Sequence, residues 1–339
     1  MTEKQLIALL EKFGSAIRDA VLAGIRDIRD NARITEIVGM IEQQNIEGAL
    51  RALGYNPAVF NNYHVLLVQA FQEGGMMLMM AQPKYTPDPT GVMTMLRFNV
   101  RDREAEKWLS ERSSALVTDI EEDVRLAVRD TVREGMEQGR NPRSVALDLV
   151  GRYNSATGHR EGGVVGLGAR EQGWSRSVRQ QLLSLDPQYL ERKLRDKRFD
   201  GIVRAAIASG KPLTAEQVTK LVDRYRDRAL KHRGDTIGRT EALAALNRSE
   251  YESTKQALAQ SGLPPDAAHK VWDSAGDSRV RHTHAEMDGQ RVGIDEPFVS
   301  PSGARLMHPH DMSLGAPGAE VIDCRCRVRY DIRFGAGLK

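Results

Sequence analysis

Both cysteines of this 339-residue chain, and four of its eight histidines, lie between Trp272 and Cys326. Thiolates and imidazoles are the usual ligands of tetrahedral zinc, so this density of soft ligands predicts a metal site. The alternative is that the cysteines are small buried hydrophobes and the histidines polar loop residues. The best ligand candidates are His284, His308, Cys324 and Cys326, with His282, His310 and Asp288 behind them.

Metal-dependent hydrolysis is the chemistry that such a cluster could perform. It needs a metal with an open coordination position, or a histidine base held by an acid. The chain contains neither H-E-x-x-H nor G-x-S-x-G, and two cysteines favour a closed, structural zinc site. We therefore expect a protein that is not an enzyme. A metal-dependent nuclease or hydrolase remains the alternative.

Strands and a turn must position these ligands. Glu320 to Ile332 alternates polar and apolar residues, which predicts a strand with both thiols on its inward face. Such a strand would hold the two sulfur atoms roughly 7 Å apart. Asp288-Gly289 is a signal for a two-residue hairpin that brings its flanking segments together.

An ordered set of motifs extends through this region. Trp272 is followed by a D-x-R-V-R-x-x-H run from Asp277 to His284, a D-G turn, a Pro-x-Asp at Pro309 and a closing C-R-C. Upstream, Arg-Thr-Glu stands at 239–241 on a helical pattern. Together, over roughly residues 224–329, these resemble the head-morphogenesis family of tailed phages, the minor head proteins similar to protein F of phage Mu. His282 is an extra histidine, and His310 stands where a glycine is more usual.

The resemblance implies a minor head protein of a tailed phage or prophage. Its expected partners are the portal protein and the major capsid or scaffold proteins, with no membrane. We expect a low-copy oligomer in the inner capsid near the portal, assembled in the bacterial cytoplasm. It would act in head assembly and in DNA packaging or ejection. The alternative function is a metal-dependent nuclease or hydrolase acting during packaging.

The resemblance also favours a structural clamp between the long helix and the C-terminal unit. Arg239 and Glu241 are two residues apart on the helix, so they face different directions and do not pair with each other. Arg239 could reach Asp277, or Glu241 could reach Arg281. The alternative is a solvated stretch of helix.

Composition and periodicity predict an α+β fold that is mostly α. Charged residues make up 28% and aromatic residues 5%, as in helix-rich proteins. No signal sequence opens the chain, and the most apolar run, 64–83, is interrupted by polar residues and falls short of a membrane span. Two cysteines cannot form a disulfide framework, so we expect synthesis in a reducing compartment.

We predict four consecutive segments. They are a helical N-terminal domain at 1–83, a Pro-containing linker at 84–100, a helical middle domain at 101–265 and a C-terminal α+β domain with a short antiparallel sheet at 266–339. The middle domain contains a Gly-rich excursion at 158–173, expected to be a loop or a mobile excursion. It ends in helices at 214–232 and 235–261.

Positive charge is concentrated between Arg140 and Thr240. This block has 21 Lys and Arg against 11 Asp and Glu, a net of +10, so the rest of the chain carries −7 to give the total of +3. Such a surface would attract double-stranded DNA through its phosphates without reading bases. The alternative is that the arginines pair with neighbouring acids. The candidate contacts are Arg192, Lys193, Arg195, Lys197, Arg198, Arg224, Arg226 and Arg228.

Overall fold

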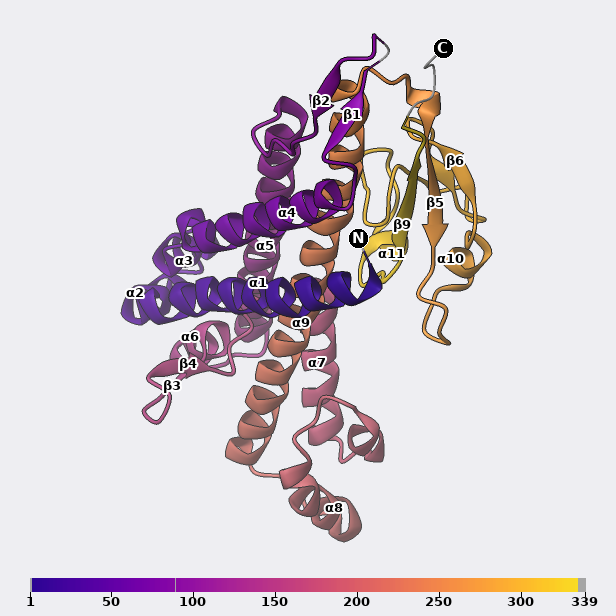
Figure 1. Ribbon diagram of the computed structural model, residues 1–339. Helices are drawn as coiled ribbons and strands as arrows, with labels where there is room; N and C mark the ends of the chain where they lie inside the picture. The colour runs from indigo at the N-terminus through magenta and orange to yellow at the C-terminus, as the bar shows by residue number, and fades with distance from the viewer. Residues whose placement is uncertain (1, 89, 335–339) are drawn as a thin grey trace. The chain divides into compact units, whose positions relative to one another are not determined.

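The computed structural model describes residues 2–88 and 90–334 (Figure 1). Helices dominate this part of the chain, and its strands form small antiparallel sheets, which confirms the predicted mostly α, α+β class. None of the described helices is both long enough and apolar enough to cross a bilayer.

The helices alternate with short strands. The α-helices are α1 (Glu3–Asn31), α2 (Ile34–Glu42), α3 (Ile46–Leu53), α4 (Asn61–Met80), α5 (Arg103–Glu137), α6 (Pro142–Val150), α7 (Ala169–Leu183), α8 (Asp200–Ser209), α9 (Ala215–Gln260), α10 (His282–Glu286) and α11 (Gly318–Val321). The 3-10 helices are η1 (Pro57–Phe60), η2 (Pro187–Glu191), η3 (Lys197–Phe199) and η4 (Pro265–Ala267). The strands are β1 (Tyr85–Pro87), β2 (Met93–Met95), β3 (Arg152–Asn154), β4 (His159–Glu161), β5 (Ala268–Asp273), β6 (Arg291–Gly293), β7 (Phe298–Val299), β8 (Arg305–Leu306) and β9 (Arg327–Ile332).

The chain forms two compact units, and each is discontinuous in sequence. Unit 1 comprises Met1–Asp19, Asn62–Ser113 and Asp235–Lys339, and unit 2 comprises Ala20–Asn61 and Ser114–Gly234. Helices α1, α5 and α9 each contribute residues to both units. The segment boundaries expected at 83, 100 and 265 therefore do not coincide with the limits of these units.

Helix α9 is continuous where two helices were expected. The predicted break falls at Gly234, but this glycine lies inside the helix, where a Cβ would come 3.0 Å from Leu22. Gly238, one turn further on, has a Cβ position only 2.2 Å from the carbonyl oxygen of Gly14 on α1. Glycine in α9 thus allows close packing of helices, and it does not mark a helix end.

Residues 84–88 and 90–100 of unit 1 were expected to belong to a linker, but they contain two paired strands. Strand β1 pairs antiparallel with β2, with Thr86 opposite Thr94. The following residues are held against α9 by two glutamine side chains: Gln256 exchanges hydrogen bonds with the backbone of Asn99, and Gln260 with that of Arg97.

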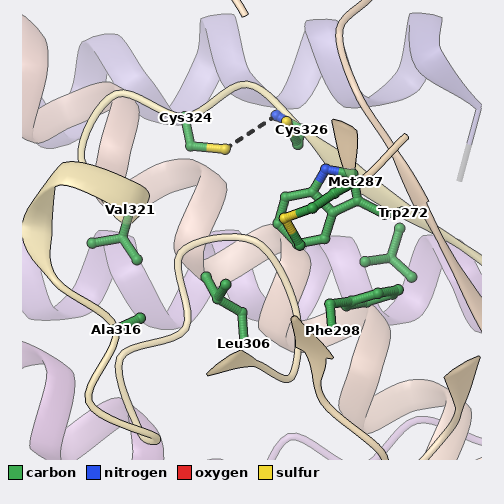
Figure 2. Close-up of a cluster of buried hydrophobic side chains, with 9 residues drawn as sticks. Trp272, Met287, Phe298, Leu306, Ala316, Val321, Cys324 and Cys326 are labelled. Atoms are coloured by element: carbon green, nitrogen blue, oxygen red, sulfur yellow. Dashed lines mark hydrogen bonds between the residues drawn. The ribbon is translucent and has the colours of Figure 1, made fainter. Parts of the chain in front are cut away.

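The C-terminal part of unit 1 has the predicted antiparallel sheet, in the strand order β6-β5-β9. The two-residue hairpin expected at Asp288-Gly289 is wrong, because the short helix α10 precedes this turn. The strands on either side of the turn, β5 and β6, do pair as expected. Of the two residues only Gly289 has a positive φ, and its N–H donates to Trp272 O at 2.9 Å. A buried cluster fills the space beneath the sheet (Figure 2): Trp272, Met287, Phe298, Leu306, Ala316, Val321, Cys324, Cys326 and Val328.

In unit 2, residues 162–168 of the Gly-rich stretch form a loop, as one of the two alternatives predicted, but this loop is packed against its neighbours. Residues 163–168 are buried, and the Arg29 guanidinium donates to Gly163 O at 2.8 Å and to Val165 O at 2.9 Å. A Cβ on Gly163 would meet the backbone of Val150 at 2.5 Å. Glycine is therefore needed because two backbone segments touch.

Gly163→Ala should lower the free energy of unfolding by about 1–3 kcal/mol, the usual cost of forcing extra atoms into a packed interior. Gly173→Ala is the matched control, because Gly173 lies in α7 with open space around its Cβ position. That change should be neutral or stabilise the protein by about 0.5–1 kcal/mol. Urea unfolding measures both effects, and equal stabilities of the two variants would contradict the packing argument.

Candidate metal centre

His284, Cys324 and Cys326 come together in unit 1. The Nδ1 atom of His284 lies 3.4 Å from Cys324 Sγ and 3.5 Å from Cys326 Sγ. The three ligand atoms all lie within 4.8 Å of one another, and all three side chains are buried. This group could hold a metal ion.

A tight turn, and not a strand, carries the two cysteines. The strand expected from Glu320 begins only at Arg327 as β9, and α11 occupies part of the preceding stretch. Asp323 has φ +59, so the chain reverses just before the C-R-C motif. The N–H of Cys326 then donates to Cys324 Sγ at 3.4 Å, the dashed line in Figure 2. The turn explains why the sulfurs are closer than a regular strand would place them.

Glu320 at the end of α11 supports the histidine. Its Oε2 lies 2.8 Å from Nε2 of His284, a hydrogen-bond distance although the ring N–H is not aimed straight at the oxygen. Burial opposes ionisation of Glu320, but hydrogen bonds from Ser302 and Thr283 and the neighbouring His284 lower its pKa. A carboxylate beside Nε2 favours the tautomer in which Nδ1 is free to bind a metal.

The pKa values of the two thiols are shifted in opposite directions. The hydrogen bond with Cys326 lowers the pKa of Cys324 against the effect of burial. The same hydrogen bond, together with burial, raises the pKa of Cys326. A bound cation would stabilise both cysteines as thiolates, because it lowers the pKa of a coordinated thiol. Two sulfurs and one imidazole nitrogen at this separation fit a zinc ion.

The structure does not bring His308 into this group, contrary to the ligand prediction. Its Nδ1 lies 2.9 Å from Pro309 O, its ring packs 5.8 Å from that of Tyr251 on α9, and burial lowers its pKa to about 4. The neighbouring His310 takes the place near the cysteines. It has φ +68, and its Nε2 lies 3.0 Å from Cys324 O, so His310, and not His308, supports the turn that carries the cysteines. His282 is exposed beside Glu286.

A tetrahedral ion takes four ligands. Among the described residues, no fourth His, Cys, Asp or Glu joins this group. A closed four-residue site was expected. Three protein ligands would leave the fourth position to water or to another molecule.

The clamp exists, but with partners other than those predicted. Arg239 forms an ion pair with Asp323, and the N–H of Asp323 donates to Thr240 Oγ1 at 3.0 Å. Helix α9 is therefore fastened to the turn that carries the cysteines. Asp323 was missed, although its place next to Cys324 in the sequence was a usable signal.

The other proposed clamp residues bind elsewhere. Asp277 pairs with Arg325, whose Nη1 lies 2.7 Å away. Glu241 accepts hydrogen bonds from Arg112 at 2.7 and 2.8 Å and from Tyr63 at 3.0 Å. Arg281 donates to the carbonyl oxygen of Ile322. The predicted pairs Arg239 with Asp277 and Glu241 with Arg281 are therefore wrong.

Most of the candidate DNA-binding arginines pair with acids of unit 2. Arg195 binds Asp200 at 3.0 Å, Arg198 and Arg228 lie 2.6 and 3.3 Å from Asp196, and Arg224 lies 3.1 Å from Glu161. These contacts favour the ion-pair alternative.

The structure excludes Arg226 from the proposed DNA-binding residues. It is buried and donates to Ser175 Oγ at 2.8 Å, so it cannot lie on a DNA-binding surface. Arg192 donates to Gln181 at 2.6 Å and lies over the ring of Tyr225. Lys193 and Lys197 are exposed.

Residues 197–329 match the family model described as Phage Mu protein F like protein. Over this region the chain is similar to the Phage Mu protein F-like family. The F-like region contains Arg239, Glu241 and the whole metal centre, and the match confirms the resemblance carried by the motifs.

One curated relative is YqbB of Bacillus subtilis (strain 168), an uncharacterized protein that is 31% identical over 99 residues. The match covers 28% of this chain and 30% of the Bacillus protein, so the chain spans less than a third of that relative. No solved structure matches the chain.

Proposed function

We propose that the protein is a minor head protein of a tailed phage or prophage, which acts in head assembly beside the portal. The observation that carries this proposal is the F-like match over 197–329, which encloses the compact metal centre and the α9 clamp. The C-terminal part of unit 1 acts as a rigid docking module for portal, capsid or scaffold subunits, and no substrate is turned over.

In this proposal zinc has a structural role. It would be held by Nδ1 of His284 and the sulfurs of Cys324 and Cys326, and it would supply a link between α10 and the turn before β9. Glu320 orients the imidazole, and Asp323 fastens the turn to α9. The docking surface around this link is thereby fixed in one conformation.

The proposed function also includes nonspecific contact with DNA. The net charge of +10 between Arg140 and Thr240 supports nonspecific attraction to DNA phosphates. Among the candidate residues, the exposed side chains are those of Lys193, Lys197, Arg198 and Arg228, although Arg198 and Arg228 pair with Asp196. Because so many arginines are already paired, this contact is weak and strongly salt-dependent.

A second candidate function is metal-dependent hydrolysis during packaging. The observation that favours it is the three-ligand group, since catalytic zinc sites commonly have three protein ligands and one open position. The burial of all three ligands argues against it, because a substrate needs access to the metal.

Co-expression with the portal protein and the major capsid protein of the same phage tests the proposal. We expect the wild-type protein to sediment with assembled heads and to be captured by tagged portal. Cys324→Ser/Cys326→Ser should lose this capture, whereas His282→Ala, a change in an exposed histidine of the same motif, should retain it. Absence of the wild-type protein from purified heads would contradict the proposal. Zinc-dependent cleavage of plasmid DNA would favour the second candidate.

A further inference from the structure

The β1–β2 hairpin of unit 1 has an exposed apolar face (Figure 1). Tyr85 lies opposite Met95 and Pro87 opposite Met93, and directly opposed residues of an antiparallel pair have their side chains on the same face. Tyr85 is 47% exposed and Met93 is 59% exposed. Val92, next to Met93 at the turn, is also exposed. Apolar side chains gathered on one exposed face mark an interaction site, whereas scattered ones do not.

The other face fixes the hairpin on unit 1. Thr86, between Tyr85 and Pro87, is buried. Leu96, the residue after β2, packs with Met79 of α4 and Ala257 of α9 in a buried cluster. The hairpin is therefore held in place through one face while its apolar outer face remains open to solvent.

The two edges of the hairpin differ in what they offer to a further strand. The N–H of Leu96 donates to Lys84 O at 3.2 Å. Because hydrogen-bonded and non-hydrogen-bonded pairs alternate along an antiparallel ladder, the N–H and C=O groups of Met93 and Met95 point away from β1. No backbone partner for these groups lies in the described part of the chain. On the β1 edge, Pro87 has no N–H to donate, so the β2 edge is the open one.

Two cations flank the apolar face. The ammonium group of Lys84 lies 5.6 Å from the centre of the Tyr85 ring, and Nε of Arg97 lies 3.1 Å from Sδ of Met95. Both cations are exposed, and neither forms an ion pair with a carboxylate among residues 2–88 and 90–334. A partner that covers the face would gain affinity and a faster association rate from carboxylates beside these two side chains.

The acid within the hairpin is occupied by its own turn. Asp88 accepts from the hydroxyl of Thr90 at 2.6 Å and from the N–H of Val92 at 2.9 Å, and these hydrogen bonds lower its pKa. Asp88 is therefore not the acid that Lys84 and Arg97 lack, and a second copy of the hairpin would present the same two cations. A charged carboxylate at the turn also opposes insertion of the hairpin into lipid.

We propose that the outer edge of β2 binds an extended segment of another protein chain, which adds a third strand to the hairpin. Alternate side chains of this segment are apolar and lie beside Met93 and Met95, and carboxylates at its end lie near Arg97 and Lys84. Main-chain hydrogen bonds supply affinity, and the flexible methionines adapt to apolar side chains of different shapes. The proposal does not rest on the function proposed above, because β1 and β2 lie outside residues 197–329.

A display library of random dodecapeptides, sorted on the full chain, tests this surface. We expect enriched peptides to alternate apolar residues and to have carboxylates at one end. A synthetic peptide of this kind is then titrated by fluorescence anisotropy. Met93→Glu should weaken its binding about tenfold, because the new carboxylate stands in the apolar face and repels an acidic peptide. Arg97→Glu should have an effect of about the same size, through loss of the attracting cation.

Met80→Glu is the matched control, because Met80 is an exposed methionine of α4 outside the hairpin. This variant should bind the peptide as the wild type does, and melting temperatures check that all three variants are folded. Enrichment of basic peptides, or equal binding of the peptide by Met93→Glu and wild type, would overturn the proposal.

Two N-methylated versions of the peptide test strand pairing itself. One carries N-methyl groups at its odd positions and the other at its even positions. Since a strand uses alternate N–H groups on each of its edges, only one version should lose binding. Equal affinities of the two versions would contradict the addition of a strand.

Two further measurements identify a different occupant of the surface. Analytical ultracentrifugation detects a dimer that Met93→Glu dissociates, and flotation with phosphatidylglycerol vesicles detects lipid binding that the same change abolishes. Either result, without peptide binding, would overturn the proposal in favour of a second copy or a membrane. All of these outcomes are independent of whether the protein sediments with phage heads, so failure here is distinguishable from failure of the proposed function.

Discussion

Purified protein will contain about one zinc ion per chain, and Cys324→Ser/Cys326→Ser will contain none. The physical reason is that the sulfurs and the His284 Nδ1 atom already lie within 4.8 Å of one another in a buried site. Because an ion that binds only the folded chain stabilises it, removal of the ion should lower the melting temperature by many degrees. Elemental analysis and thermal unfolding, with and without a chelator, measure both effects.

His282→Ala is the control for this experiment, since His282 is exposed and pairs with Glu286. It should retain zinc and the wild-type melting temperature. Glu320→Gln should retain the site but weaken its zinc affinity about 10–100-fold, the usual effect of losing a supporting carboxylate. The zinc hypothesis would be wrong if the purified wild-type protein contained no metal and a chelator did not change its melting temperature.

Lys270→Met will stabilise the protein at neutral and acidic pH. Lys270 on β5 is fully buried, and its ammonium group donates to Met307 O at 2.8 Å and lies 5.2 Å from the ring centres of Tyr251 and Phe298. Burial lowers its pKa from 10.5 to about 7, against the opposing effects of Asp311 and Asp295. A buried cation without a close carboxylate is costly, and methionine fills a similar volume without charge.

The sign of the pH dependence follows from this lowered pKa. Between pH 7 and 10.5 the unfolded chain binds a proton that the folded chain does not, so the wild-type protein gains stability as pH rises. Below pH 7 both states carry the proton, and the folded state bears the full cost of the buried charge. The free energy of unfolding of Lys270→Met should therefore exceed that of the wild type by about 2–4 kcal/mol at pH 6.5, and by less at pH 9.5.

Urea unfolding at these two pH values measures the difference. Lys255→Met is the matched control, because Lys255 is partly exposed and lies 3.3 Å from Asp295. Lys255→Met should change the free energy of unfolding by no more than about 0.5 kcal/mol. A Lys270→Met variant that is less stable than the wild type at both pH values would show that the carbonyl and aromatic contacts outweigh the burial of the charge.

Local rules in the sequence predicted several helix ends correctly. Asn141-Pro142 is typical of a helix start, and at the start of α6 the Asn141 side chain accepts from the N–H of Arg143 at 2.9 Å. The capping box at the start of α9 is formed by Thr214 and Gln217, with hydrogen bonds of 2.9 and 3.2 Å. Such signals depend on residues within one turn, so one sequence is enough to recognise them.

The candidate site was predictable only in part. Residue types and motif order pointed to His284, Cys324 and Cys326, which lie together. Periodicity failed at the cysteines because a non-glycine residue, Asp323, adopts a left-handed conformation that no local pattern announces. His308 and the clamp pairs depended on long-range packing against α9, and spacing along the chain says little about such contacts.

The discontinuity of unit 1 has a consequence for how the protein is made. Its first segment ends at Asp19 and its last begins at Asp235, so this unit cannot close until the ribosome has synthesised most of the chain. Until then the apolar faces of early helices, such as Phe13 on α1 and Phe71 on α4, lack their final neighbours. Until its last segment is made, the nascent chain exposes these apolar faces, which favours aggregation.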